Sequence, residues 1–198
     1  MARVAAVIFA AGESSRFGRP KQLLRLKNKS LVRRIVDAAR DANCSPIIVV
    51  TGSGRNQVES EVAGTSSTVV HNASWKAGMG GSIRTGVQYL AETEPEVEAA
   101  MLLVCDQPLV EASVMRRLIS LREQTQKPIV ASSYATTFGV PALFDRSCFP
   151  ELLALDGDSG AKTIILSNRD RVAELPFPGG AIDIDTVEDW EALGRRAT

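Results

Sequence analysis

The stretch Val4-Ala5-Ala6-Val7-Ile8-Phe9-Ala10-Ala11-Gly12 decides the fold of this chain. Residues 4–10 are all apolar and lead into a loop of small residues. An unbroken apolar run of this length is typical of a strand buried on both faces, as in parallel sheets that carry helices on both sides. The stretch therefore predicts an α/β protein whose first strand delivers a loop at its carboxyl end.

The rest of the chain alternates strand-like and helix-like segments, which favours a mostly parallel, mixed sheet with helices on both faces. We expect further extended segments over 47–51, 68–70, 99–105, 129–132, 140–144, 171–176 and 181–184. We expect helices over 30–42, 55–63, 82–91, 111–126, 149–155, 159–167 and 186–195. The length of 198 residues suits a single domain, 1–198, with a substantial core.

Composition excludes several classes of protein. No apolar run approaches the roughly 18–20 residues of a membrane-spanning helix, and a net charge of zero does not favour nucleic-acid binding. The odd number and wide spacing of Cys44, Cys105 and Cys148 fit neither a disulfide framework nor a zinc site, so we expect a cytoplasmic protein. Residues 1–40 nevertheless hold ten basic and only two acidic side chains, which suggests a local anion site.

The loop after the first strand is the first candidate site. Gly12 and Gly18 allow close approach of the backbone and positive φ angles, and free backbone N–H groups can bind an anion. Its spacing matches neither the dinucleotide fingerprint nor the P-loop, and an ordinary β–α turn with basic residues remains the alternative. The predicted nucleotide-binding residues are Ala10, Ala11, Gly12 and Gly18, with Arg16 and Lys21 as catalytic cations at the phosphates.

Carboxylates near strand ends are the candidate metal ligands. Asp106 follows the apolar run 101–105, although a turn or helix cap would place an aspartate there too. Mg²⁺, or Mn²⁺ in its place, typically takes one or two protein carboxylates together with phosphates and waters. Alternation puts Asp183 and Asp185 on one face, and we assign Asp183 as the second ligand. Asp185 stays open between a ligand and the cap of the last helix, in a capping box with Glu188.

A glycine-rich connection precedes the helix expected from Ser82. Gly80, Gly81 and Ser82 can present backbone N–H groups to a base or ribose, and the alternative is a flexible loop whose Trp75 packs on the core. His71 is the only histidine, and we assign it no catalytic role. None is required if the acceptor is a phosphate monoester, because its second pKa near 6 leaves it a dianionic nucleophile at neutral pH.

These motifs together resemble the MobA/MocA group of nucleotidyltransferases, which have a glycosyltransferase-A-like fold. The likeness is carried by F-A-A-G-E-S-S-R-F-G-R-P-K-Q-L-L, H-N-A-S-W-K-A-G-M-G-G-S-I-R-T-G, L-L-V-C-D-Q-P-L-V, G-V-P-A-L-F, G-D-S-G-A-K and A-I-D-I-D-T-V-E-D. Within the group the chain is most similar to the molybdenum cofactor cytidylyltransferases, because Ala11-Gly12 stands where guanylyl-transferring relatives usually have two glycines. Phe9 in place of leucine and Gly81 in place of serine depart from the pattern.

The resemblance implies the substrates and some of the roles. CTP and molybdopterin with its terminal phosphate would react with release of pyrophosphate, while Gly12, Arg16 and Lys21 bind the triphosphate and Asp106 holds Mg²⁺. A client molybdoenzyme would be a further partner. GTP as donor, a sugar or polyol phosphate as acceptor, and a non-catalytic cofactor carrier remain alternatives.

One more segment suits the acceptor. Residues 157–162 read Gly-Asp-Ser-Gly-Ala-Lys between two helical stretches, and such a helix start favours anions. We expect Asp158 to accept hydrogen bonds from pterin N–H groups. The alternative is a helix capped by Asp158 or Ser159.

Overall fold

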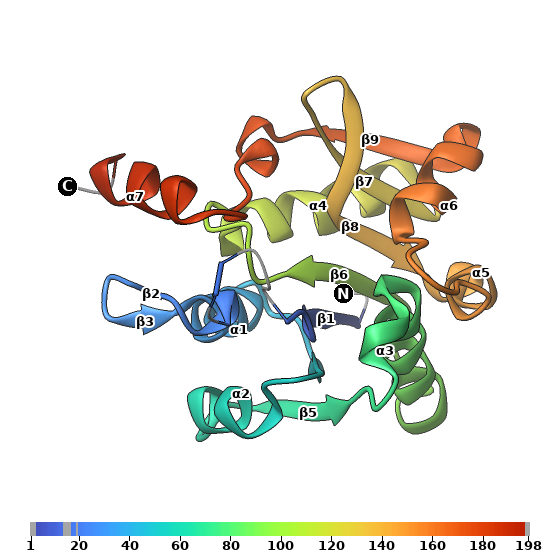
Figure 1. Ribbon diagram of the computed structural model, residues 1–198. Coiled ribbons are helices and arrows are strands. Elements are labelled where there is room, and N and C mark those ends of the chain that lie inside the picture. The colour runs from blue at the N-terminus through green and yellow to red at the C-terminus, as the bar shows by residue number, and fades with distance from the viewer. Residues whose placement is uncertain (1–2, 14–16, 19, 197–198) are drawn as a thin grey trace.

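The computed structural model describes residues 3–13, 17–18 and 20–196 (Figure 1). These residues form a seven-stranded sheet in the order β5-β4-β1-β6-β8-β7-β9, in which β8 is antiparallel to both neighbours and the other pairs are parallel. The strands are β1 (Val4–Ala10), β4 (Ile47–Thr51), β5 (Ser67–His71), β6 (Ala99–Val104), β7 (Ile129–Tyr134), β8 (Thr137–Asp145) and β9 (Val172–Pro176). A separate two-stranded hairpin joins β2 (Arg25–Leu26) to β3 (Lys29–Ser30). The predicted α/β fold with a mixed, mostly parallel sheet is confirmed.

Helices cover both faces of the sheet, as expected. The apolar cluster on one face contains side chains of α1 (Leu31–Asp41), α2 (Arg55–Val62) and α4 (Ala112–Thr125). The cluster on the other face contains side chains of α3 (Met79–Thr93), α5 (Phe149–Leu153) and α6 (Ala161–Ser167). Alternate residues of β1 enter the two clusters, which is why its sequence is apolar at every position.

The last helix, α7 (Val187–Arg196), lies away from α3 and α5, which pack side by side (Figure 1). Its Leu193 belongs to a smaller apolar cluster with Phe17, Leu24 and Leu31. The C-terminal helix therefore packs on the segment that follows the first loop. No helix among the described residues is long and apolar enough to cross a membrane.

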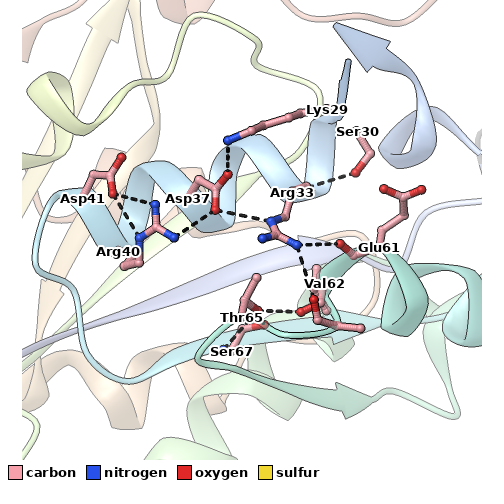
Figure 2. Close-up of polar contacts among 11 residues, drawn as sticks. Lys29, Ser30, Arg33, Asp37, Arg40, Asp41, Glu61, Val62, Thr65 and Ser67 are labelled. Atoms are coloured by element: carbon pink, nitrogen blue, oxygen red, sulfur yellow. Dashed lines mark hydrogen bonds and ion pairs between the residues drawn. The ribbon is translucent and has the colours of Figure 1, made fainter. Parts of the chain in front are cut away.

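A polar network joins α1 to its neighbours (Figure 2). Asp37, buried on α1, forms ion pairs with Lys29, Arg33 and Arg40. Arg33 also donates to the backbone carbonyls of residues 61 and 63 at the end of α2. Ser30 accepts a hydrogen bond from the backbone N–H of Arg33, so the predicted cap of this helix is confirmed.

Two local predictions were wrong, and one alternative is excluded. Residues 181–184 were expected to be extended, but Pro178–Ala181 form a 3-10 helix and 182–185 run without strand pairing. The helix expected from Ser82 begins three residues earlier, at Met79, after a 3-10 helix at Trp75–Ala77. The helix after residue 157 has Gly160 as its N-cap with no side-chain cap bond, so neither Asp158 nor Ser159 caps it.

Candidate active site

The chain reverses its winding direction between β1 and β6. From β1 it continues through β4 and β5 on one side, and β6 pairs with β1 on the other. Phe9 of β1 lies beside Val104 of β6, so the segments after both strands leave the sheet at the same edge. Ligands of open α/β sheets bind at such a switch point, beyond the carboxyl ends of the strands.

A cleft of about 360 Å³ lies at this edge. It is lined by Phe9, Ala10, Ala11, Gly12, Glu13, Lys21, Gln22, Trp75, Lys76, Gly78, Met79, Ser82, Val104, Cys105 and Asp106. The structure thus brings together the first loop, the carboxylate after β6 and the start of α3, which lie far apart in the sequence. Such a cleft of mixed apolar and polar lining is the usual form of a small-molecule site.

Lys21 links the first loop to the carboxylates. It opens a 3-10 helix (Lys21–Leu23), and its Nζ donates to Asp106 Oδ2 at 3.2 Å and to Asp185 Oδ1 at 2.8 Å. Burial works to lower the pKa of Lys21, but its hydrogen bonds to Asp185 and Asp106 and their negative charges outweigh it and raise the pKa. Lys21 therefore keeps its positive charge within the cleft.

Asp183 and Asp185 reach the site on the irregular segment before α7. The backbone N–H of Ile184 donates to the carbonyl of Asp106 at 2.9 Å, which holds this segment against the end of β6. The pKa of Asp183 is raised to about 6, first because the surrounding protein desolvates it and then because Asp106 is close. Asp183 therefore lies near Asp106, although strand alternation is not the reason.

The cap of α7 differs from the predicted one. Thr186 Oγ1 accepts from the backbone N–H of Asp189, and Asp189 Oδ2 accepts from the backbone N–H of Thr186. This reciprocal pair is a capping box shifted by one residue from the predicted Asp185 and Glu188 pair. The carboxylate of Asp185 is engaged with Lys21 instead.

The site suits a divalent cation in its charge and donor type. Asp106 and Asp185 both pair with the ammonium group of Lys21, and Asp183 lies near Asp106. Carboxylate oxygens are the ligands that Mg²⁺ and Mn²⁺ favour, and a divalent ion would balance the remaining negative charge. Among the described residues no three His, Cys, Asp or Glu side chains are grouped closely enough to hold a metal alone, so phosphates and waters would complete its coordination.

The start of α3 is packed tightly against the 156–158 loop. The backbone N–H of Gly80 donates to the carbonyl of Gly157 at 3.0 Å, and a Cβ on Gly80 would lie 2.7 Å from the carbonyl oxygen of Asp156. Gly78 has φ +110, and a Cβ there would lie 2.6 Å from Asp158 Oδ1. Exposed Asp158 is therefore beside the cleft rim at Gly78, although it does not line the cleft.

The other predicted residues of this region have separate positions. Ser82 lines the cleft, but its Oγ accepts from Asn72 Nδ2 at 3.1 Å and is buried. Gly80 and Gly81 do not line the cleft, and a Cβ on Gly81 would have its nearest contact at 3.5 Å. Trp75 does not pack away into the core, because it is half-exposed and lines the cleft.

The first loop is described only in part. Gly12 lines the cleft, but its φ is not in the positive region, and a Cβ there would contact nothing within 4 Å among the described atoms. The expected positive φ is found at Gly18, at +73, outside the cleft lining. The predicted catalytic cation Arg16 lies outside the described residues.

Sequence reasoning missed several cleft residues. Gln22 is buried with Nε2 3.5 Å from the carbonyl oxygens of Ala10 and Gly12, beneath the first loop. Lys76 lies over the ring of Trp75, 5.4 Å from its centroid. Its position next to Lys21 could have pointed to Gln22 as a site residue. The 3-10 helix turns its side chain toward the first loop, and the sequence did not predict that helix.

A protein-family model describes the MobA-like NTP transferase domain and matches residues 6–172, which contain the first loop, the start of α3 and Asp106. The chain belongs to this family. It is a nucleotidyltransferase.

Two curated relatives match almost end to end. The purine catabolism protein PucB of Bacillus subtilis is 26% identical over 96% of this chain and 95% of its own length. The molybdenum cofactor cytidylyltransferase of Escherichia coli is 25% identical over 100% of this chain and 99% of its own length.

A solved structure is also similar. Rv0371c of Mycobacterium tuberculosis has a TM-score of 0.82 and 32% identity, covering 97% of each chain. The same protein in complex with manganese has a TM-score of 0.76 and 30% identity, covering 96% of this chain and 97% of that one. These likenesses confirm the nucleotidyltransferase fold predicted from the motifs.

Proposed function

We propose that this protein transfers CMP from CTP to the terminal phosphate of molybdopterin, with Mg²⁺ as the bound cation and pyrophosphate as the second product. The observation that carries the proposal is the single cleft that joins the first loop, Lys21 and Asp106. The choice of cytidine and of molybdopterin rests on the residue pair Ala11-Gly12 and on the full-length likeness to the cytidylyltransferase of Escherichia coli.

The reaction needs positioning and charge neutralisation rather than a base. A phosphate oxygen of the acceptor, already ionised at neutral pH, attacks the α-phosphorus of the nucleotide. The bond from that phosphorus to the bridging oxygen breaks, and pyrophosphate leaves with the electron pair. The negative charge on the transferred group and on the leaving group is what the site must stabilise.

Residues in and beside the cleft have distinct parts in this proposal. Lys21 pairs with phosphate oxygens, and Arg16 serves the same triphosphate from the adjacent loop. Asp106 and Asp183 would hold the metal ion, with Asp185 beside them. When bound, the metal neutralises phosphate charge and aligns the α-phosphate.

The base and ribose lie toward the start of α3 in this proposal. Gly78, Met79 and Ser82 line that side of the cleft together with Trp75, which packs so closely on Gly52 that a Cβ there would lie 2.8 Å from Trp75 Cβ. Gly80 acts by letting the helix start pack against the 156–158 loop, and the acceptor approaches past Asp158.

A substrate panel tests the proposal. The pure protein is incubated with Mg²⁺ and each of the four ribonucleoside triphosphates, with molybdopterin, a sugar phosphate or a polyol phosphate as acceptor. Pyrophosphate is measured. Release confined to CTP with molybdopterin is the expected result, while release with GTP or another acceptor would move the assignment within the family. No release under any combination would favour a non-catalytic carrier.

A further inference from the structure

The ammonium group of Lys21 occupies the position where two carboxylates converge. Its Nζ forms ion pairs with Asp106 at 3.2 Å and Asp185 at 2.8 Å. The Lys21 side chain is 18% exposed, so these attractions are screened less than those of surface pairs. The same Asp106 oxygen that faces Lys21 belongs to the carboxylate proposed to hold the metal ion.

We propose that Lys21 and the divalent cation compete for Asp106, and that Lys21 leaves the carboxylates for the nucleotide phosphates when the metal–nucleotide complex binds. The inference rests on the proposed metal-dependent function and adds to it an exchange of partners. Lys21 thereby holds the carboxylates together and restrains metal binding until a nucleotide is present.

Charge geometry makes the two cations exclusive. A carboxylate oxygen holds Mg²⁺ at about 2.0–2.1 Å. An ammonium group hydrogen-bonded to the same carboxylate would then lie within a few Å of the ion, and like charges at that separation repel strongly in a partly buried site. The backbone of Asp106 is held by the hydrogen bond from Ile184 two residues beyond β6, whereas Lys21 ends a flexible side chain, so Lys21 is the group that moves.

The ammonium group of Lys21 has room in the cleft to reach a bound triphosphate. It lines the same cleft as Ala11, Gly12 and Lys76, on the side where the first loop would receive the triphosphate. An ammonium on a four-carbon stem can turn from one set of oxygens to another without moving the backbone. Phosphate oxygens would replace the hydrogen bonds that it loses from Asp106 and Asp185.

Manganese binding without nucleotide tests this exchange, because it requires no turnover. The affinity for Mn²⁺ is measured by electron paramagnetic resonance of the free ion, for the wild type and for Lys21→Met. Loss of the competing charge should tighten Mn²⁺ binding by about tenfold or more. Lys21→Arg keeps the charge and should stay close to the wild type.

Lys76→Met is the matched control, since it removes the same charge from the same cleft without touching a carboxylate. Its Mn²⁺ affinity should change little. If Lys76→Met tightens Mn²⁺ binding as much as Lys21→Met, the gain comes from removing any positive charge from the cleft, and the proposed exchange is wrong. Unchanged or weaker Mn²⁺ binding in Lys21→Met also overturns it. Lys21→Gln repeats the comparison should the methionine variant have a lowered unfolding midpoint.

Adding CTP separates this inference from the proposed function. One outcome contradicts the exchange and leaves the metal-dependent function intact. In it, the wild type binds Mn²⁺ when CTP is present, but without CTP Lys21→Met binds Mn²⁺ no more tightly than the wild type. Absence of protein-bound Mn²⁺ both with and without CTP contradicts the metal assignment itself, and the exchange with it.

Discussion

At the scale of single residues, the proposed reaction depends most on the side chain of Asp106. It lies two residues beyond the end of β6 and contacts Lys21, and its charge helps to raise the pKa of the nearby Asp183 carboxyl. Asp106→Ala should lower kcat by 10² or more, the order expected for loss of a main electrostatic element. The unfolding midpoint should change little, because the side chain is partly exposed. Glu96→Ala removes an exposed carboxylate outside the cleft and should match the wild type. A near wild-type rate for the pure Asp106 variant would remove this residue from the mechanism.

Two adjacent glycines of α3 should respond differently to the same substitution. Gly80→Ala would place a Cβ 2.7 Å from the carbonyl oxygen of Asp156, whereas Gly81→Ala has its nearest contact at 3.5 Å. We expect Gly80→Ala to lose about 1–3 kcal/mol of unfolding free energy through overpacking. Gly81→Ala should be neutral or slightly stabilising, because alanine favours a helix over glycine. Denaturant unfolding measures both variants. Equal losses of unfolding free energy would show that the close contact with Asp156 does not destabilise Gly80→Ala.

Asp158 separates acceptor binding from stability. Because Gly160 rather than Asp158 is the N-cap of α6, Asp158→Ala should cost no capping energy. We expect it to raise KM for molybdopterin while KM for CTP stays unchanged, since Asp158 lies beside the cleft rim rather than in its lining. Asp156→Ala, at an exposed neighbour, is the control. A change confined to the unfolding midpoint would contradict an acceptor role.

At the scale of elements, the α1 network makes stability depend on pH (Figure 2). Burial works to raise the pKa of Asp37, but the hydrogen bond from Lys29 and the charges of Lys29, Arg33 and Arg40 outweigh it and lower the pKa. A carboxyl with a lowered folded-state pKa stabilises the fold above its unfolded pKa of about 3.9, and this contribution is lost as the pH falls through the folded value.

Asp37→Asn should therefore destabilise the protein by about 2 kcal/mol at pH 7, and by less as the pH falls below about 4. Asp41→Asn is the matched control, because Asp41 is exposed and pairs only at the surface, where such pairs contribute under about 1 kcal/mol. Urea unfolding at pH 7 and at pH 3 measures the difference. A cost for Asp37→Asn that stays constant across this range would show that packing, not charge, is lost.

At the scale of the whole molecule, apolar patterning predicted the main strands and helices but not the contacts between residues far apart in the sequence. The bounds of β1 and β4 agree with the predicted ranges, because β1 is apolar throughout, β4 is apolar up to its final Thr51, and both end at a loop. The β2–β3 hairpin was missed, since each strand has only two residues and little apolar character. The segment at 181–184 was mistaken for a strand because alternation alone does not supply a pairing partner.

The candidate site was predictable where a motif sits at a strand end. The alternating pattern put the first loop and Asp106 at strand ends, and Ala10, Ala11, Gly12, Lys21 and Asp106 meet in one cleft because β1 and β6 are neighbours, which the pattern did not predict. The contact of Lys21 with Asp185 joins residues 164 positions apart, and no local pattern encodes it. It arises because α7 packs back on the segment that follows the first loop.

The central claim is that this molecule moves a nucleoside monophosphate, in a reaction that needs a divalent cation. CTP labelled at the α-phosphate is incubated with molybdopterin and the pure protein, with Mg²⁺ or with a chelator, and both labelled products and pyrophosphate are counted. The account predicts one labelled acceptor for each pyrophosphate released with Mg²⁺, and neither product with the chelator. Label released as free CMP without an acceptor adduct, or equal transfer in the chelator, would contradict it.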